Sequence, residues 1–133
     1  MSDFQTVTHC VAQKHHRCYE CGGGIAPTEV YEKTVGTWDG NFSTFKVCNA
    51  CEQARDWLIE ETDWPDDIDG DGHQWFFGQL REHLIEQARH GDRRFALRAY
   101  RHLVGMNRRR AAYREAYNAE TVRLRDMAKG GAA

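Results

Sequence analysis

Residues 17–57 read RCYECGGGIAPTEVYEKTVGTWDGNFSTFKVCNACEQARDW and hold four of the five cysteines of this 133-residue chain. They form two Cys-x2-Cys pairs, Cys18/Cys21 and Cys48/Cys51. A Cys-x2-Cys turn folds both sulfurs to one side, so each pair can supply two corners of a zinc tetrahedron. A redox pair would require a surrounding βαβ pattern, which is missing, and an odd cysteine total fits a disulfide framework poorly. The spacing therefore predicts one structural Zn²⁺ on these four cysteines.

The residues around the two pairs predict a knuckle, a β-hairpin and a helix, in that order. Glycines 22–24 would let backbone amides approach the thiolates of the first pair. The β-rich segments 30–38 and 42–48 are joined at the turn sequence DGN, which is typical of a hairpin. After Cys48, residues 49–61 have apolar side chains at helical spacing, so Cys51 is expected in the first turn of a helix.

Four motifs carry a resemblance to a known family: C-Y-E-C-G-G-x-I, P-T-E-V-Y-E, W-D-G, and C-N-A-C entering a helix. They resemble the treble-clef zinc modules of LIM-like and ribbon-like proteins, in particular small zinc proteins of tailed bacteriophages. The match covers about residues 15–60. It implies that the four paired cysteines bind the metal around a small core of Ile25, Tyr31 and Trp38. At position 28 this chain has Thr28 where the family usually has glycine. The resemblance implies a structural scaffold, and it does not imply a particular activity, because no activity is agreed for proteins of this family.

We predict an α+β protein with a treble-clef zinc-binding module over residues 1–65, an acidic linker over 66–74 and an α-helical bundle or extension over 75–133. The first 14 residues are expected to form a short strand or a loose arm. Cys10 lies outside both pairs and is expected to be a small, partly buried side chain.

The C-terminal part has the periodicity of about three amphipathic helices, at 74–91, 92–107 and 108–131. Gly91 is expected to end the first helix, and Asp92 is placed to cap the second. The apolar positions are expected to form the core. They are Phe77, Leu80, Leu84, Ala88, Phe95, Leu97, Tyr100, Leu103, Val104, Tyr113, Ala116, Tyr117, Leu124 and Met127.

The segment ETDWPDDIDGDGHQW raises the question of a calcium site. Asp67, Asp69 and Asp71 match the opening of a twelve-residue calcium loop, but its twelfth position is Gly78, where a bidentate glutamate is required. A solvated acidic linker is the favoured interpretation, and an ion at residues 66–72 stays open. Trp64-Pro65 is expected to close the zinc module by packing on Trp57.

Catalysis is not predicted for this chain. HNH-type nucleases also use treble clefs, but they need a histidine base on the hairpin and a second metal-binding residue on the helix. No histidine lies between Cys21 and Cys48. His15 and His16 precede the first pair and are interpreted as exposed polar residues. A catalytic zinc is disfavoured because four thiolates close the coordination shell.

Charge is divided unevenly along the chain, whose net charge is −2. Residues 1–75 have five Lys/Arg against fourteen Asp/Glu, and residues 76–133 have thirteen against six. The run Arg108, Arg109 and Arg110 could contact phosphates or an acidic protein surface. It could equally be a solvated face neutralised by the acidic half. Because the overall balance is acidic and no aromatic–basic alternation marks a stacking platform, we rank protein contact above nucleic acid.

The sequence therefore favours a non-enzymatic, zinc-stabilised protein-interaction module. Given the resemblance, we expect a phage-encoded accessory protein that binds and modulates or inhibits a host or defence protein. Trp38, Tyr113 and Arg109 are the candidate hot spots for the partner, together with Arg108 and Arg110. The alternatives are a nucleic-acid-binding regulator that uses the arginine-rich helices and, last, an HNH-like nuclease. With no signal segment and no apolar run of membrane-spanning length, we expect a cytoplasmic protein without a membrane partner.

Overall fold

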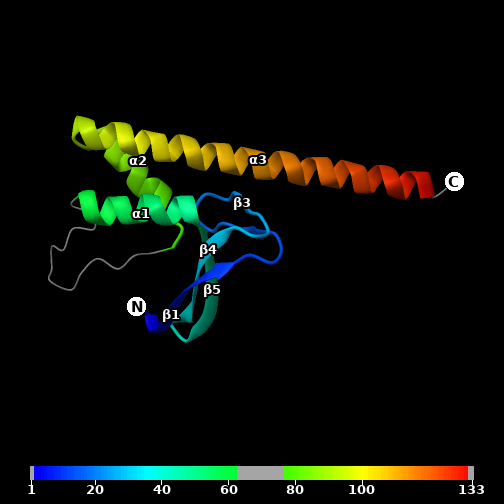
Figure 1. Ribbon diagram of the computed structural model, residues 1–133, viewed down its shortest axis with the longest axis horizontal. Helices are drawn as coiled ribbons and strands as arrows, with labels where there is room; N and C mark the ends of the chain where they lie inside the picture. The colour runs from blue at the N-terminus through cyan, green and yellow to red at the C-terminus, as the bar shows by residue number, and fades with distance from the viewer. Residues whose placement is uncertain (1, 63–76, 132–133) are drawn as a thin grey trace.

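Three antiparallel strands form the larger sheet of the protein, whose computed structural model describes residues 2–62 and 77–131. Strands β1 (Ser2–Val11), β4 (Val30–Trp38) and β5 (Asn41–Cys48) lie side by side in the order β1-β4-β5. The central strand β4 pairs with both neighbours along nearly its whole length. Figure 1 shows this sheet on one side of α1, with two further helices on the other side. The prediction of a mixed α+β protein is confirmed.

The predicted hairpin is formed by β4 and β5, and its turn lies at Asp39 and Gly40. Both residues have positive φ, 52° and 79°. Two consecutive positive φ angles give the turn a twist that matches the twist of the strands, and Asp-Gly tolerates them well. The DGN sequence thus predicted this turn correctly.

Thr28 also has a positive φ, 78°, in the turn that precedes β4. The N–H of Thr28 donates to the carbonyl oxygen of Ala12 over 2.8 Å, and that of Ala12 donates to Glu29 over 2.9 Å. These bonds hold the turn in a conformation that a β-branched residue rarely adopts. The turn that would suit glycine is therefore kept with threonine in place.

The N-terminal residues form a strand and not a loose arm. β1 is ten residues long and pairs with β4 from Ser2 to Val11. Residues 5–9 are all exposed, so neither face of the strand has the apolar alternation that identifies a strand in a sequence. The backbone ladder with β4 holds β1 in place, and a sequence pattern does not reveal such a ladder.

Helix α1 (Asn49–Glu61) follows Cys48 directly and buries one face, as predicted. Its buried residues include Cys51 in the first turn, and Trp57, whose ring packs against Phe95 and His102 at centroid distances of 6.2 and 5.4 Å. The predicted contact of Trp57 with Trp64-Pro65 and the whole predicted linker 66–74, with its acidic residues 66–72, lie outside the described residues.

Helix α2 (Leu80–His90) begins later than the sequence periodicity predicted. Gly78 precedes it with a φ of 94°, which is incompatible with a helix that runs through this residue. The carboxylate of Glu20 accepts hydrogen bonds from the backbone N–H groups of Gly78 and Leu80. A carboxylate in this position satisfies free N–H groups and complements the positive end of the helix dipole.

The second and third of the predicted C-terminal helices, at 92–107 and 108–131, are one continuous helix, α3 (Arg93–Gly131). Residues 75–133 therefore contain two described helices and not three. The predicted cap is confirmed, since Asp92 Oδ1 accepts from the backbone N–H of Arg94 over 3.2 Å. Gly105 does not end the helix, because an interior glycine costs only about 1 kcal/mol relative to alanine. The following arginines 108–110 are good helix formers.

The apolar face of α3 differs from the predicted one. Ala99 and Met106 are buried, while Leu97 and Tyr100 are more than half exposed. From Arg114 to Gly130 every side chain except Thr121 is exposed. Four predicted core residues in this segment are thus exposed: Ala116, Tyr117, Leu124 and Met127. Figure 1 shows why, because this end of α3 extends past all the other drawn elements.

The buried hydrophobic side chains form one cluster that includes residues from both predicted domains. Its members are Ala12, Cys18, Cys21, Ile25, Tyr31, Val47, Cys48, Cys51, Ala54, Trp57, Leu58, Leu80, Leu84, Ala99 and Met106. Ile25 and Tyr31 were predicted as core; the side chain of Trp38 lies outside the described part. Among the described helices, none is both long enough and apolar enough to cross a bilayer.

Candidate metal centre

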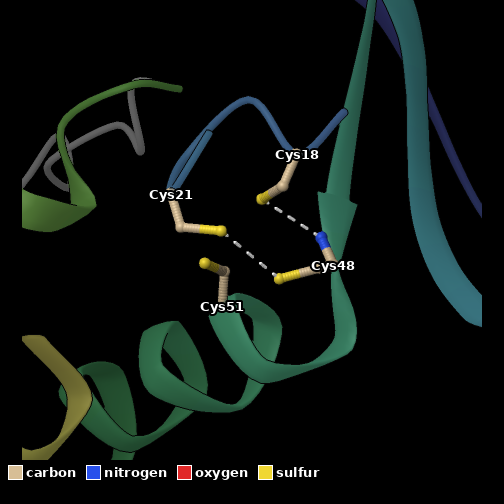
Figure 2. A group of neighbouring side chains, drawn as sticks. All are labelled: Cys18, Cys21, Cys48 and Cys51. Atoms are coloured by element: carbon tan, nitrogen blue, oxygen red, sulfur yellow. Dashed lines mark hydrogen bonds between the residues drawn. The ribbon is translucent and has the colours of Figure 1, made fainter. Parts of the chain in front are cut away.

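Four elements bring the paired cysteines together (Figure 2). Cys18 and Cys21 lie in the turn between two short paired strands, β2 (His16–Arg17) and β3 (Gly24–Ile25), and we call residues 16–25 the knuckle. Cys48 is the last residue of β5, and Cys51 lies in the first turn of α1. The hairpin therefore returns the second pair to the first.

The four sulfurs fit a zinc ion. They all lie within 4.8 Å of one another, and the Sγ atoms of Cys21 and Cys48 are 3.8 Å apart. With Zn–S bonds of ~2.3 Å, the edge of a regular tetrahedron is also ~3.8 Å. All four residues are at most 5% exposed, and all are free thiols. A buried set of four thiols is a donor set that structural Zn²⁺ sites use, so a metal site at this position is supported.

Backbone N–H groups donate to two of the sulfurs. Gly23 N–H donates to Cys21 Sγ, and Cys48 N–H donates to Cys18 Sγ, each over 3.3 Å. Gly22 adopts a φ of 72°, which turns the chain back at this point. The two N–H···S hydrogen bonds orient the sulfurs and stabilise negative charge on them. The predicted approach of a glycine amide to a thiolate is confirmed at Gly23, whereas the N–H of Gly22 donates to the carbonyl oxygen of Cys18.

Crowding of the four thiols shifts their pKa values in opposite directions. A hydrogen bond with Cys18 is the main cause that lowers the pKa of Cys21. A second hydrogen bond with Cys18 is the main cause that lowers the pKa of Cys48, to about 7. The pKa of Cys18 is raised by its bond with Cys21, and the pKa of Cys51 is raised by its bond with Cys18. Without a cation the four groups share protons, whereas a divalent metal ion would allow all four to be thiolates.

Arg109 of α3 reaches the same cluster. Its Nε donates to Cys21 Sγ and its Nη2 to Cys51 Sγ, both over 3.5 Å. Burial lowers the pKa of this guanidinium, but the hydrogen bond to Cys21 and the charge of Cys51 outweigh it and raise the pKa. Four thiolates on Zn²⁺ leave a net charge of −2, which a guanidinium partly offsets. No sequence signal connects Arg109 to a cysteine 88 residues away.

Close packing at Gly23 places α3 against the knuckle. A Cβ on Gly23 would lie 2.6 Å from Arg109 Cβ and 3.1 Å from the Arg109 backbone carbon. The missing side chain therefore lets the helix approach closely enough for the guanidinium to reach the sulfurs. At Gly24 a Cβ would meet Tyr113 at an ordinary contact distance of 3.5 Å.

The predicted partner-binding residues lie in different environments. Arg108 is exposed, whereas Arg109 and Arg110 are half-buried. Tyr113 is half-buried, and its ring lies under the guanidinium of Arg17 at 4.7 Å. Trp38 is at the end of the hairpin, and nothing is described of its side chain. The arginine run is therefore not one surface, since Arg109 faces the cysteines.

A second group, His9, Glu32 and Glu52, also has donor atoms within 4.8 Å of one another. Each of its three side chains already has an ion-pair partner. Arg55 donates to both carboxylate oxygens of Glu32, over 2.7 and 2.5 Å, and His9 Nε2 lies 2.6 Å from Glu52 Oε1. A guanidinium that occupies Glu32 opposes binding of a further cation. This group is an ion-pair network on the sheet and α1.

His15, His16 and the fifth cysteine, Cys10, are not part of the four-sulfur cluster. His15 is exposed, as predicted. His16 is half-buried; its Nδ1 lies 3.0 Å from Lys46 Nζ, and burial lowers its pKa. Cys10 is half-buried as expected, near the hydroxyl of Thr8 at 3.7 Å. Searches of protein-family models, curated proteins and solved structures returned no match to this chain.

Proposed function

We propose that the protein is a non-enzymatic interaction module in which a zinc-bound treble clef holds one end of a long helix and presents the other end to a partner protein. The order of knuckle, hairpin and helix around four sulfurs supports the treble clef. Four cysteine ligands and the guanidinium of Arg109 surround the metal position, so no open coordination position is offered to a substrate. We place the protein in the cytoplasm, where thiols stay reduced.

The observation that carries the proposal is the unpartnered end of α3, residues 114–131, which we call distal α3. The buried positions Ala99 and Met106 continue at intervals of seven or four residues as Tyr113, Tyr117 and Leu124. Residues at these intervals lie on one face of a helix. The face that packs on the rest of the protein therefore runs on into solvent.

A helix of this kind fits a hydrophobic groove on another protein. Tyr117, Leu124 and Met127 are 62%, 53% and 63% exposed, which is uncommon for large apolar side chains on one short segment. The partner we propose is a host or defence protein of a bacterium, and the chain a phage-encoded accessory protein that modulates or inhibits it. That origin rests on the motif resemblance and stays a prediction.

The test is capture of bacterial proteins on the immobilised, zinc-loaded chain, with two matched variants. Leu124→Asp places a charge on the proposed face. Val122→Asp places the same charge at a position that is equally exposed, 54% against 53%, but about 200° around the helix. We expect a captured protein that is lost with Leu124→Asp and kept with Val122→Asp. Capture that is indifferent to both variants, or an apolar face that only joins two copies of the chain in sedimentation, would refute the proposal.

A further inference from the structure

A groove lined by arginines runs along the junction between the knuckle and α3. One part, of about 320 Å³, is lined by Arg17, Arg81 and Arg110 together with knuckle residues. The adjoining part, of about 340 Å³, shares Arg17 and is lined by Arg114 and two tyrosines. We call it the arginine groove, and it shares Tyr113 and Tyr117 with the face of α3 proposed above for a protein partner.

Within the described part of the chain, none of the four guanidiniums of this groove is paired with a carboxylate. Arg17 donates to the carbonyl oxygen of Gly22 over 3.2 Å and covers a tyrosine ring. One carboxylate, Glu20, lines the groove, and it accepts hydrogen bonds from the backbone N–H groups of Gly78 and Leu80 at the start of α2. Four guanidiniums from three elements, with one lining carboxylate that already binds backbone N–H groups, leave an excess of positive charge that attracts an anion with several charges.

Two tyrosines extend the groove along α3. The rings of Tyr113 and Tyr117 are nearly parallel, at 20°, with centroids 6.5 Å apart. Arg17 covers Tyr113, and Tyr117 is 62% exposed. Flat aromatic faces beside arginines are the means by which proteins bind the bases and phosphates of single strands. The sequence does not predict this arrangement, because Arg17 is far from the two tyrosines along the chain.

From this arrangement we infer that the arginine groove binds single-stranded nucleic acid, with phosphates on Arg17, Arg110 and Arg114 and a base stacked on Tyr117. Arg110 and Arg114 are one helical turn apart, ~6 Å along the axis, which is comparable to the separation of neighbouring phosphates in an extended strand. A duplex keeps its bases stacked inside, so it cannot use the tyrosine. An acidic protein segment would use the arginines and leave the aromatic faces unused.

The thiolate centre acts against this binding, and Arg109 limits its effect. Zinc bound by four thiolates would place a net charge of −2 beside the groove, since Cys18 and Cys21 line it. Arg109 donates to two of these sulfurs and so offsets part of that charge. Binding is therefore expected to be moderate and dependent on salt.

The test is fluorescence anisotropy of the zinc-loaded full chain with a labelled oligothymidylate, its duplex with oligoadenylate, and polyglutamate. Three phosphate contacts predict that affinity for the single strand falls about 20-fold between 50 and 200 mM salt. We expect Arg114→Glu and Tyr117→Ala each to weaken binding about tenfold. Arg101→Glu, an exposed charge reversal on the opposite side of α3, should leave it unchanged.

Each contrary outcome is distinct. Equal affinity for the duplex, with no effect of Tyr117→Ala, would overturn the stacking and leave a nonspecific basic surface. Preference for polyglutamate would assign the groove to an acidic protein. No binding at 50 mM salt, or equal losses with Arg101→Glu, would overturn the inference altogether. Unchanged zinc content and helicity of each variant exclude misfolding as the cause.

Discussion

The cysteine module (residues 2–62) and distal α3 are held in place by different means. In the module, four sulfurs, a three-stranded sheet and one face of α1 enclose a buried cluster. In distal α3, the described residues are supported by backbone hydrogen bonds and by local contacts along the helix, such as the ion pair of Arg123 with Glu120 and the stacking of Tyr117 on Tyr113. Helices of this kind are marginal without tertiary packing. We therefore expect substitutions in the cysteine module to change the stability of the protein, and substitutions in distal α3 to change the binding of a partner.

Loss of one metal-binding cysteine should have the largest effect on stability, and this effect should arise in the cysteine module. Structural zinc contributes ~10 kcal/mol or more to folding in isolated finger peptides. Cys48→Ser should therefore abolish the cooperative thermal transition and release the metal, whereas Cys10→Ser should change little. An unchanged melting temperature for Cys48→Ser would show that the cluster does not hold the fold together.

Truncation of leucines sharpens the comparison directly. Leu84 is fully buried on α2, and Leu124 is 53% exposed on distal α3. Leu84→Ala should lower the free energy of unfolding by ~2–5 kcal/mol, and Leu124→Ala by less than about 0.5 kcal/mol. Urea denaturation of the two variants measures both. A large loss for Leu124→Ala would mean that distal α3 already packs on something, for example a second copy.

The contact between the two regions can be broken at the knuckle. Gly23→Ala places a Cβ 2.6 Å from Arg109 Cβ and should cost ~1–3 kcal/mol by pushing α3 away. Gly24→Ala, with its nearest contact at 3.5 Å, is the matched control. Hydrogen exchange should show faster opening of α3 near Arg109 for the first variant only. Equal protection in both would argue against tight docking of α3.

Relief of strain in the module should stabilise it slightly. Thr28 has a φ of 78°, a region that costs a residue with a side chain roughly 1–2 kcal/mol and glycine almost nothing. After the greater flexibility of glycine in the unfolded chain is subtracted, Thr28→Gly should raise stability by up to ~1 kcal/mol. A fall in the urea midpoint would show that the threonine side chain makes a compensating contact.

The smallest effect concerns pH and again involves the module alone. The hydrogen bond to Glu52 raises the pKa of His9 above 6.5. Protonated His9 therefore favours the folded state, fully so below pH ~6.5, and this contribution is lost as pH rises through the raised pKa. The melting temperature should fall slightly over that interval, and His9→Gln should flatten the dependence. An identical pH profile for His9→Gln would contradict the pairing.

Local patterns predicted the module better than the helical part. The cysteine spacing, the Asp39-Gly40 turn and the Asp92 cap each depend on residues close in sequence, and the structure has all three. The predicted buried face of α3 was wrong because large apolar residues such as Leu97 outweighed Ala99 in the sequence pattern. Packing against α1 and α2 selects the face, and it depends on contacts distant in sequence.

The contacts that connect the regions had no sequence signal at all. Arg109 belongs to a run of three arginines that looks uniform, yet it alone among them donates to the sulfurs in the described structure. Helical geometry points neighbouring residues about 100° apart, so a run of like charges is divided among several faces. The predicted helix boundary between residues 107 and 108 was wrong, since α3 runs through it, and the tolerance of a long helix for Gly105 depends on its surroundings.

The central claim, that four cysteines hold one structural zinc, is tested most directly by X-ray absorption at the zinc edge on the purified chain. The account predicts one zinc per chain with four sulfur neighbours at ~2.3 Å and no nitrogen or oxygen in the first shell. The Cys10→Ser variant should give the same spectrum. Absence of zinc from protein prepared without chelator, or a shell of mixed sulfur and nitrogen or oxygen ligands, would contradict the claim.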